Sequence, residues 1–148
     1  MRFNELYNQK ILEFISENRC DLSNLSLQKI NSNIYSFTNL IELNLSENQI
    51  CHISSQIENL LNLKTLNLSD NIIEELPSNI GNITELENLF LSGNRLKVLP
   101  KTIVNLKKLK WLSLLDNKEL LINEEQKIWI EELKNSFPDF VAGSPKAF

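Results

Sequence analysis

A period of 23 residues runs through the middle of this 148-residue chain and restricts its fold more than any other feature of the sequence. Apolar residues and one asparagine return at the same slots of each unit. The columns are Leu43, Leu66, Leu89 and Leu112; Leu45, Leu68, Leu91 and Leu114; Asn48, Asn71, Asn94 and Asn117; and Ile53, Leu76, Leu99 and Ile122. Since one such unit cannot cover its own apolar face, successive units must stack into an elongated solenoid.

Within one unit, the apolar spacing changes from that of a strand to that of a helical turn. The alternation Leu66-Asn67-Leu68 predicts a short strand with one buried face, and Leu76, Ile80 and Ile83 suit a tight helical or 3₁₀ return. Stacked strands then form a parallel sheet along the inside of a curve. The asparagine column falls at the bend after each strand, where an amide can satisfy backbone groups that lose their ladder partners.

The unit spanning residues 63–83 follows the pattern L-x-x-L-x-L-x-x-N-x-L-x-x-L-P-x-x-I-x-x-L, with isoleucine in some of the leucine slots. This pattern resembles the leucine-rich repeat, in the 23-residue intracellular class of Ras-suppressor-like and plant Ras-group-related repeat proteins. The resemblance implies an α/β leucine-rich-repeat solenoid with a concave parallel sheet and short helical or 3₁₀ turns on the convex face. It also implies a binding module that acts as an adaptor or inhibitor of signalling enzymes or small GTPases.

The repeats lie between two segments that are expected to cap the open ends of the core. Apolar residues at helical spacing predict an N-terminal capping helix over 1–16, followed by about five repeats over 17–122. Asn123 and Gln126 have the spacing of a helix capping box, so a C-terminal capping helix is predicted over 123–140, with Trp129 as a cap residue. Residues 141–148 are expected to form a tail without regular structure.

Charge and composition limit the partners and the compartment. A formal charge of −4 and a pI near 5.1 argue against binding to nucleic-acid phosphates. Charged residues interrupt the N-terminal stretch, so no signal peptide or membrane span is predicted there. Cys20 and Cys51 lack the spacing of a zinc site and are expected to be free thiols, with Cys20 in a core column. We therefore expect a cytoplasmic protein, or one in a host cytosol if the chain is a secreted effector.

The sequence offers little for catalysis. His52, the single histidine, neighbours Cys51, but adjacent residues on an extended bend point apart. The three glycines are isolated and form no phosphate loop, and acidic residues are scattered over the repeat slots without metal-ligand spacing. We expect no enzyme activity, no catalytic residue, no metal and no cofactor.

Strand positions that face away from the core are the ones free to specify a partner protein. They are mostly polar, and Phe90, Trp111 and Leu115 break that rule. Phe90 and Trp111 occupy adjacent slots of adjacent strands, so we expect their rings to lie side by side as interface anchors. The predicted partner-binding residues are Phe90, Trp111, Leu115, Glu42, Asn44, Asn67, Asp70, Asn88, Ser113 and Asp116. In the alternative interpretation, the C-terminal helix or tail folds over the two rings.

Two further hypotheses concern function. The segment from Arg95 to Lys110 carries only basic charges, so it is a candidate for binding acidic surfaces or nucleic acid, but a solvated flank and convex face is the favoured explanation. The chain could also be the recognition part of a larger or secreted effector protein.

Overall fold

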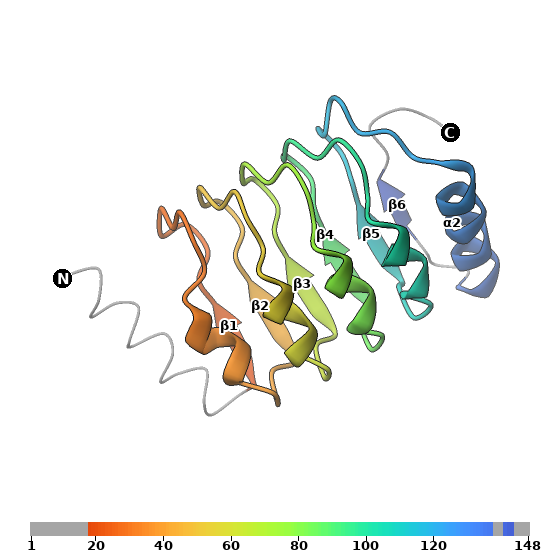
Figure 1. The fold of residues 1–148 in the computed structure, drawn as a ribbon. Helices are drawn as coiled ribbons and strands as arrows, with labels where there is room; N and C mark the ends of the chain where they lie inside the picture. The colour runs from red at the N-terminus through yellow and green to blue at the C-terminus, as the bar shows by residue number, and fades with distance from the viewer. Residues whose placement is uncertain (1–17, 138–140, 144–148) are drawn as a thin grey trace.

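The computed structural model describes residues 18–137 and 141–143, and the chain there coils into a curved solenoid (Figure 1). Six parallel strands form one sheet in chain order within the described residues. They are β1 (Arg19–Asp21), β2 (Glu42–Asn44), β3 (Thr65–Asn67), β4 (Asn88–Phe90), β5 (Trp111–Ser113) and β6 (Val141–Gly143). Leu43 pairs with Cys20 on one side and Leu66 on the other, so neighbouring strands are aligned one repeat apart.

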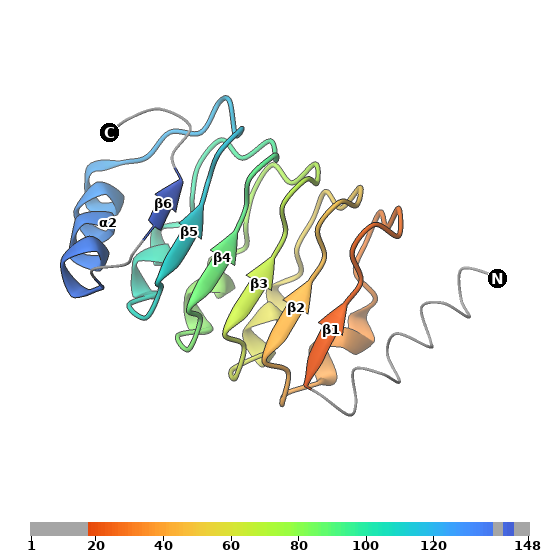
Figure 2. The same ribbon diagram turned by 180° about the vertical axis from the view of Figure 1, so that it is seen from behind.

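Short 3₁₀ helices return the chain along the side opposite the sheet (Figures 1 and 2). They are η1 (Ser32–Ser36), η2 (Ser55–Asn59), η3 (Ser78–Asn82) and η4 (Lys101–Asn105). Asn31 and Ser54 cap the first two by accepting a backbone N–H two residues on. Pro77 and Pro100 precede the other two, where the proline ring fixes the backbone angle that starts the turn. The predicted solenoid, with strands on one face and 3₁₀ turns on the other, is confirmed.

The core fills the space between the sheet and the 3₁₀ helices. Strand residues such as Leu66 and Leu89 and turn residues such as Ile80 and Ile103 point into it and are fully buried. Cys20 is also buried at the β1 end of the core, as its column predicts. Every repeat therefore buries its apolar face against its neighbours, and this burial is the main stabilising contribution to such a fold.

Buried asparagines at the ends of the strands join neighbouring repeats. The Nδ2 of Asn71 donates to the carbonyl oxygens of Leu45 (2.9 Å) and Leu68 (3.1 Å), and its Oδ1 accepts the N–H of Ile50 (2.9 Å). Asn94 and Asn117 repeat the same bonds in the next two units. The structural role predicted for this column is confirmed.

The first repeat has Leu25 in the asparagine slot, and the second repeat compensates for it. The Oδ1 of Asn48 accepts the N–H groups of both Leu25 (3.0 Å) and Leu27 (2.9 Å). One asparagine of the second repeat therefore satisfies two backbone donors of the first.

Helix α2 (Glu124–Ser136) closes the C-terminal end of the core (Figure 1). Asn123 and Gln126 form the expected capping box, and Gln126 also donates to the carbonyl of Leu99 (3.0 Å). Trp129 is only 1% exposed, and its indole N–H donates to the carbonyl of Leu106 (3.3 Å). The helix thus seals the last repeat with a large apolar side chain whose polar atom is satisfied.

The chain after α2 differs from the expected tail. Val141–Gly143 forms strand β6, which pairs in parallel with β5, so the interpretation of 141–148 as an unstructured tail is wrong for these three residues. The physical reason is that the outer edge of β5 presents unpaired backbone groups, which a short extended segment satisfies. The predicted N-terminal capping helix over 1–16 lies outside the described residues.

Candidate protein-binding surface

The positions of β1 to β5 that alternate with the core leucines, together with the bends that follow, form four rows across the sheet, and of these residues Ser46 is buried. Figure 2 shows the strands from the sheet side. Strand pairing and the backbone bonds beyond the strands hold these positions one repeat apart. We call them the concave rows: Arg19, Glu42, Thr65, Asn88 and Trp111; Asp21, Asn44, Asn67, Phe90 and Ser113; Ser23, Ser46, Ser69, Ser92 and Leu115; and Asn24, Glu47, Asp70, Gly93 and Asp116.

An aromatic pair marks the C-terminal part of the concave rows. The ring centroids of Phe90 and Trp111 are 6.1 Å apart with an interplanar angle of 45°, as expected for rings in adjacent slots. Trp111 remains 43% exposed and Leu115 45% exposed, and Phe90 is half-buried. The structure therefore brings the predicted rings together and leaves a large apolar surface open to solvent.

The C-terminal helix does not cover this pair. Helix α2 packs against η4 on the opposite side of the solenoid, and its large buried residue is Trp129. Strand β6 extends the sheet beside Trp111, in register with it, and leaves Trp111 exposed. The alternative in which the C-terminal helix folds over the rings is therefore wrong, and residues 144–148 of the predicted tail lie outside the described residues.

The polar members of the predicted site are partly engaged with their neighbours. Asn44 and Asn67 each accept the backbone N–H two residues on, in the manner of an Asx turn. Asn88 donates to the hydroxyl of Thr65 (3.0 Å), and Ser113 shares a hydrogen bond with Ser92. These contacts fix the side-chain orientations, which lowers the entropy lost when a partner binds.

Glu42 forms a bidentate ion pair with Arg19, at 2.7 and 2.8 Å, across β1 and β2. Both side chains are more than a third exposed, so the pair contributes little stability. The ion pair does affect the charge of the concave rows, because Arg19, the only basic residue in those rows, neutralises the carboxylate of Glu42.

The last of the concave rows has a backbone requirement that the sequence analysis missed. Asn24, Glu47, Asp70 and Asp116 have φ of 54° to 57°, and Gly93 has φ of 66°. Asparagine, aspartate and glycine are the residues that best tolerate this left-handed region. The recurrence of these types in one column was the available signal. Asp70 and Asp116 therefore have a structural reason to be present, in addition to the binding role predicted for them.

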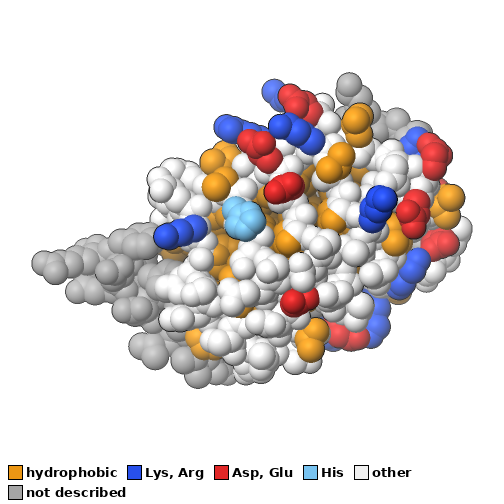
Figure 3. Space-filling model, in the orientation of Figure 1, with side chains coloured by type: hydrophobic (Ala, Val, Ile, Leu, Met, Phe, Trp, Pro, Cys, Tyr) orange, Lys and Arg blue, Asp and Glu red, His pale blue; other side chains and the backbone are white. Residues whose placement is uncertain are grey.

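Ion pairs one repeat apart account for most of the basic segment from Arg95 to Lys110. Lys97 pairs with Glu74, Lys108 with Glu85, Lys110 with Glu87, and Lys107 with Glu132 of α2. The acids lie in a stretch of sequence rich in negative charge, and the repeat period sets them beside the lysines. Figure 3 shows few charged side chains over the N-terminal repeats and groups of both signs toward the C-terminal repeats. The segment is therefore not a uniform basic surface.

Two carboxylates at contacts between repeats have lowered pKa values. Lys110 donates to Glu87 and Lys64 lies 3.3 Å from it, and together they hold the pKa of Glu87 below its ordinary value. The amides of Asn79 and then Asn82 donate to Glu58, which lowers the pKa of that carboxyl. Neither residue lies in the concave rows, so both shifts report contacts between repeats.

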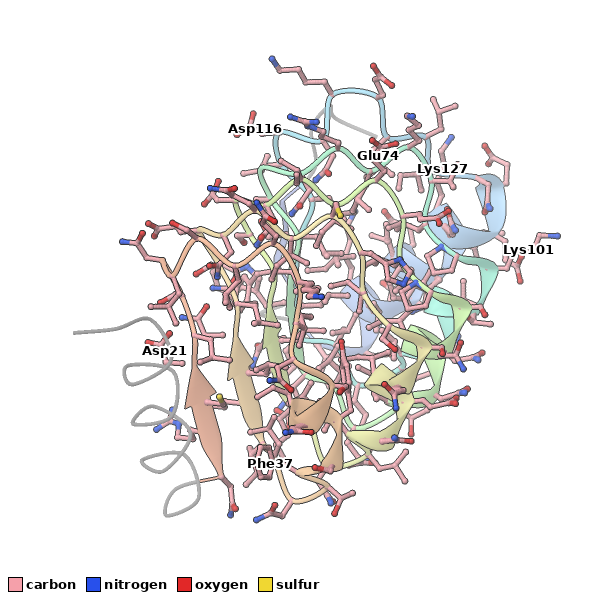
Figure 4. The ribbon with its side chains drawn as sticks, turned by 60° about the vertical axis from the view of Figure 1, so that its left-hand side comes forward. Asp21, Phe37, Glu74, Lys101, Asp116 and Lys127 are labelled. Atoms are coloured by element: carbon pink, nitrogen blue, oxygen red, sulfur yellow. The ribbon has the colours of Figure 1, made fainter. Side chains whose placement is uncertain are left out.

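The remaining chemistry is sparse within the described residues. Cys51 and His52 are both exposed, Cys51 is a free thiol, and no group of three or more potential metal ligands is found there. An open depression of about 460 Å³ lies between the bends of the last three repeats. It is lined by Glu74, Asn94, Arg95, Lys97, Asp116, Lys118 and Glu119, a mixture of charges without a buried nucleophile or base. In Figure 4, Asp116 lies toward the sheet, whereas Lys101 and Lys127 lie on the side of η4 and α2.

Comparison with known families identifies the class of protein that this geometry defines. Residues 20–135 match the family described as leucine-rich repeat region, and the chain belongs to that family. Leucine-rich-repeat domains are in general non-enzymatic scaffolds that bind other proteins on an extended concave surface. No curated protein matches the chain at the required significance.

Solved structures of bacterial and plant proteins share the fold. A leucine-rich-repeat protein of Leptospira interrogans has a TM-score of 0.64 and 32% identity, over 79% of this chain and 28% of its own. The leucine-rich-repeat ectodomain of a receptor kinase from Arabidopsis thaliana has a TM-score of 0.59 and 29% identity, over 65% of this chain and 55% of its own. The chain thus spans about a quarter and about half of these two structures.

An internalin of Listeria monocytogenes, with a TM-score of 0.58 and 23% identity, shows the fold alone. Within the part of the chain that the structure describes, no helix has the length and apolar character needed to cross a bilayer.

Proposed function

We propose that this protein is a non-catalytic recognition module that binds a partner protein through its concave rows, with Phe90 and Trp111 as the main anchors. The observation that carries the proposal is the ring pair, which is held on a rigid sheet and left exposed by the C-terminal helix. Aromatic residues in a fixed, partly desolvated setting dominate the binding energy of protein interfaces. Leu115 and the polar residues Glu42, Asn44, Asn67, Asp70, Asn88, Ser113 and Asp116 would complete the contact surface.

The length and sequence of the repeats support a more specific proposal about the class, compartment and partner of this protein. We place the chain with the 23-residue Ras-suppressor-like class because its units keep that length and the leucine-proline step in residues 76–77 and 99–100. On that basis it would be a cytoplasmic adaptor or inhibitor whose partner is a signalling enzyme or small GTPase. A secreted effector acting in a host cytosol, with this chain as its recognition part, is the competing assignment.

Binding to nucleic acid through Arg95 to Lys110 is not favoured. Lys97, Lys107, Lys108 and Lys110 form ion pairs with acids of other repeats or of α2. A phosphate backbone would have to displace these carboxylates, and the net charge of −4 opposes its approach.

The test is to capture the partner from the native cell with the full chain and then measure its affinity for variants by calorimetry. Phe90→Ala and Trp111→Ala are each expected to lower affinity by at least about 2 kcal/mol, and to leave the fold intact because neither ring is in the core.

Ile128→Ala is the matched control, because Ile128 is a large apolar residue that is 60% exposed on α2, away from the concave rows. It should bind like the wild type. Equal affinity of all three variants, with normal melting curves, would place the interface elsewhere and overturn the proposal.

A further inference from the structure

The charge of the chain is distributed very unevenly between its faces. The concave rows contain five acidic residues, Asp21, Glu42, Glu47, Asp70 and Asp116, and one basic residue, Arg19. The whole chain contains 19 acidic and 15 basic residues, so 14 of each remain elsewhere and cancel. The entire net charge of −4 therefore lies on the concave rows.

Several acids outside the concave rows are paired with lysines, whereas two acids of the concave rows are not. Glu74, Glu85, Glu87, Glu124, Glu131 and Glu132 all form ion pairs with lysines. Glu47 and Asp70 are exposed and form no ion pair with any described residue. Carboxylates without a partner, grouped on one face, produce a negative potential that attracts cationic groups.

These carboxylates belong to the same concave rows as the aromatic pair. Glu47 and Asp70 follow β2 and β3, and the rings stand on β4 and β5. Neighbouring strands are about 4.8 Å apart and each strand residue advances about 3.3 Å, so the acids, which lie one to three strands across and three to five residues along from the rings, are roughly 11 to 22 Å from them. A single segment of a partner can therefore contact both features at once.

We propose that the partner of the concave rows is a protein that presents a basic segment, in which lysine or arginine side chains stand beside an apolar side chain. The basic side chains face Glu47 and Asp70, and the apolar side chain packs on Phe90 and Trp111. This inference rests on the proposed function, since it names the chemistry of the partner for the same surface. Charge complementarity carries it, because the rest of the chain is electrically balanced.

A random peptide display library, selected on the immobilised full chain, provides the probe. We expect the enriched peptides to combine lysine or arginine with an aromatic or large aliphatic residue. Their affinity is then measured for the double variant Glu47→Gln/Asp70→Asn. Both changes keep side-chain shape, and asparagine tolerates the positive φ of Asp70. At low ionic strength the double variant should lose about tenfold in affinity, mainly through slower association.

The matched control is Glu75→Gln/Glu125→Gln, which removes the same charge from two exposed acids outside the concave rows. It should change affinity less than about twofold. If the enriched peptides are acidic or uncharged but lose affinity with Trp111→Ala, the basic partner is wrong and the proposed function stands. If basic peptides are insensitive to Trp111→Ala and to both double variants, they bind elsewhere, and both proposals fail. Failure to enrich any sequence would also overturn the inference.

Discussion

Asn71 shows how one residue type can be required at every repeat. Its amide joins three backbone groups from two repeats in a buried bend, so an aliphatic replacement leaves those groups without partners. We expect Asn71→Ala to lower the free energy of unfolding by about 2–3 kcal/mol, measured by urea denaturation.

Asn67 in the same repeat provides the comparison. It lies on the concave rows, where its Oδ1 accepts the backbone N–H of Ser69 in a turn (3.0 Å). Asn67→Ala should therefore lower stability by less than about 1 kcal/mol. Equal losses for Asn67→Ala and Asn71→Ala would contradict the assigned role of the asparagine column.

Some residue choices could be predicted from the sequence, and others could not. The core leucines and the asparagine column were predictable because a fixed period allows few explanations. Gly81 was not, because its reason lies in the neighbouring repeat: a Cβ there would come within 2.3 Å of the carbonyl oxygen of Thr102. The positive φ of Asp70 and Asp116 was not predicted either, because aspartate in an exposed column is equally typical of a polar binding surface.

At the scale of elements, contacts one repeat apart join the loops that lead into the strands. Lys64 and Lys110 both contact Glu87, from the preceding and following repeats, and Lys110 is the larger cause of its lowered pKa. A carboxyl with a lowered pKa in the folded state stabilises the fold above its unfolded pKa, and this contribution is lost as the pH falls through the folded value.

Replacing Glu87 with glutamine removes this pH-dependent contribution to stability. At neutral pH the variant should be less stable than the wild type by about 0.5–1 kcal/mol, since the group is partly exposed. The stability difference between the two proteins should decrease once the pH falls below about 4.3, the ordinary pKa of glutamate. It should disappear as the pH passes through the lower pKa that Glu87 has in the folded state. Urea denaturation of the wild type and the variant across this pH range measures the difference. A difference that is constant with pH would exclude the ionic origin.

Helix α2 is the element whose packing decides whether the last repeat is sealed. Trp129 is buried on η4, and replacing it with alanine would open a cavity and remove the bond to Leu106. We expect Trp129→Ala to lower the free energy of unfolding by about 3–5 kcal/mol. The adjacent Ile128→Ala should lower it by less than about 0.5 kcal/mol, because that side chain faces solvent. If Trp129→Ala unfolds at the wild-type midpoint, α2 is an appendage to the repeats.

The sequence predicted this helix and its capping box, because the required residues are local. It did not predict β6, whose three residues carry no strand pattern and are ordered by the open edge of β5. An interaction with a distant edge leaves little trace in the segment that makes it.

For the whole molecule, the repeat period determines both architecture and charge arrangement. Lysines and acids that are separated by one repeat in the sequence meet in the structure, whereas Glu47 and Asp70 of the concave rows form no ion pair with any described residue. The concave rows therefore combine a net negative charge with a partly exposed aromatic pair. Their residues could be read from the sequence once the strand positions were known, but the exposure of Trp111 could not, because it depends on where α2 and β6 lie.

The central claim is that the partner binds on the concave rows, and site-specific photo-crosslinking in the native cell tests it most directly. A benzophenone amino acid is placed at position 88, where Asn88 lies between the strands that carry the acids and Trp111, or at position 128 on α2. The account predicts that the same protein is crosslinked from position 88 and not from position 128. Crosslinking from position 128 alone would show that the partner binds outside the sheet and would contradict the account.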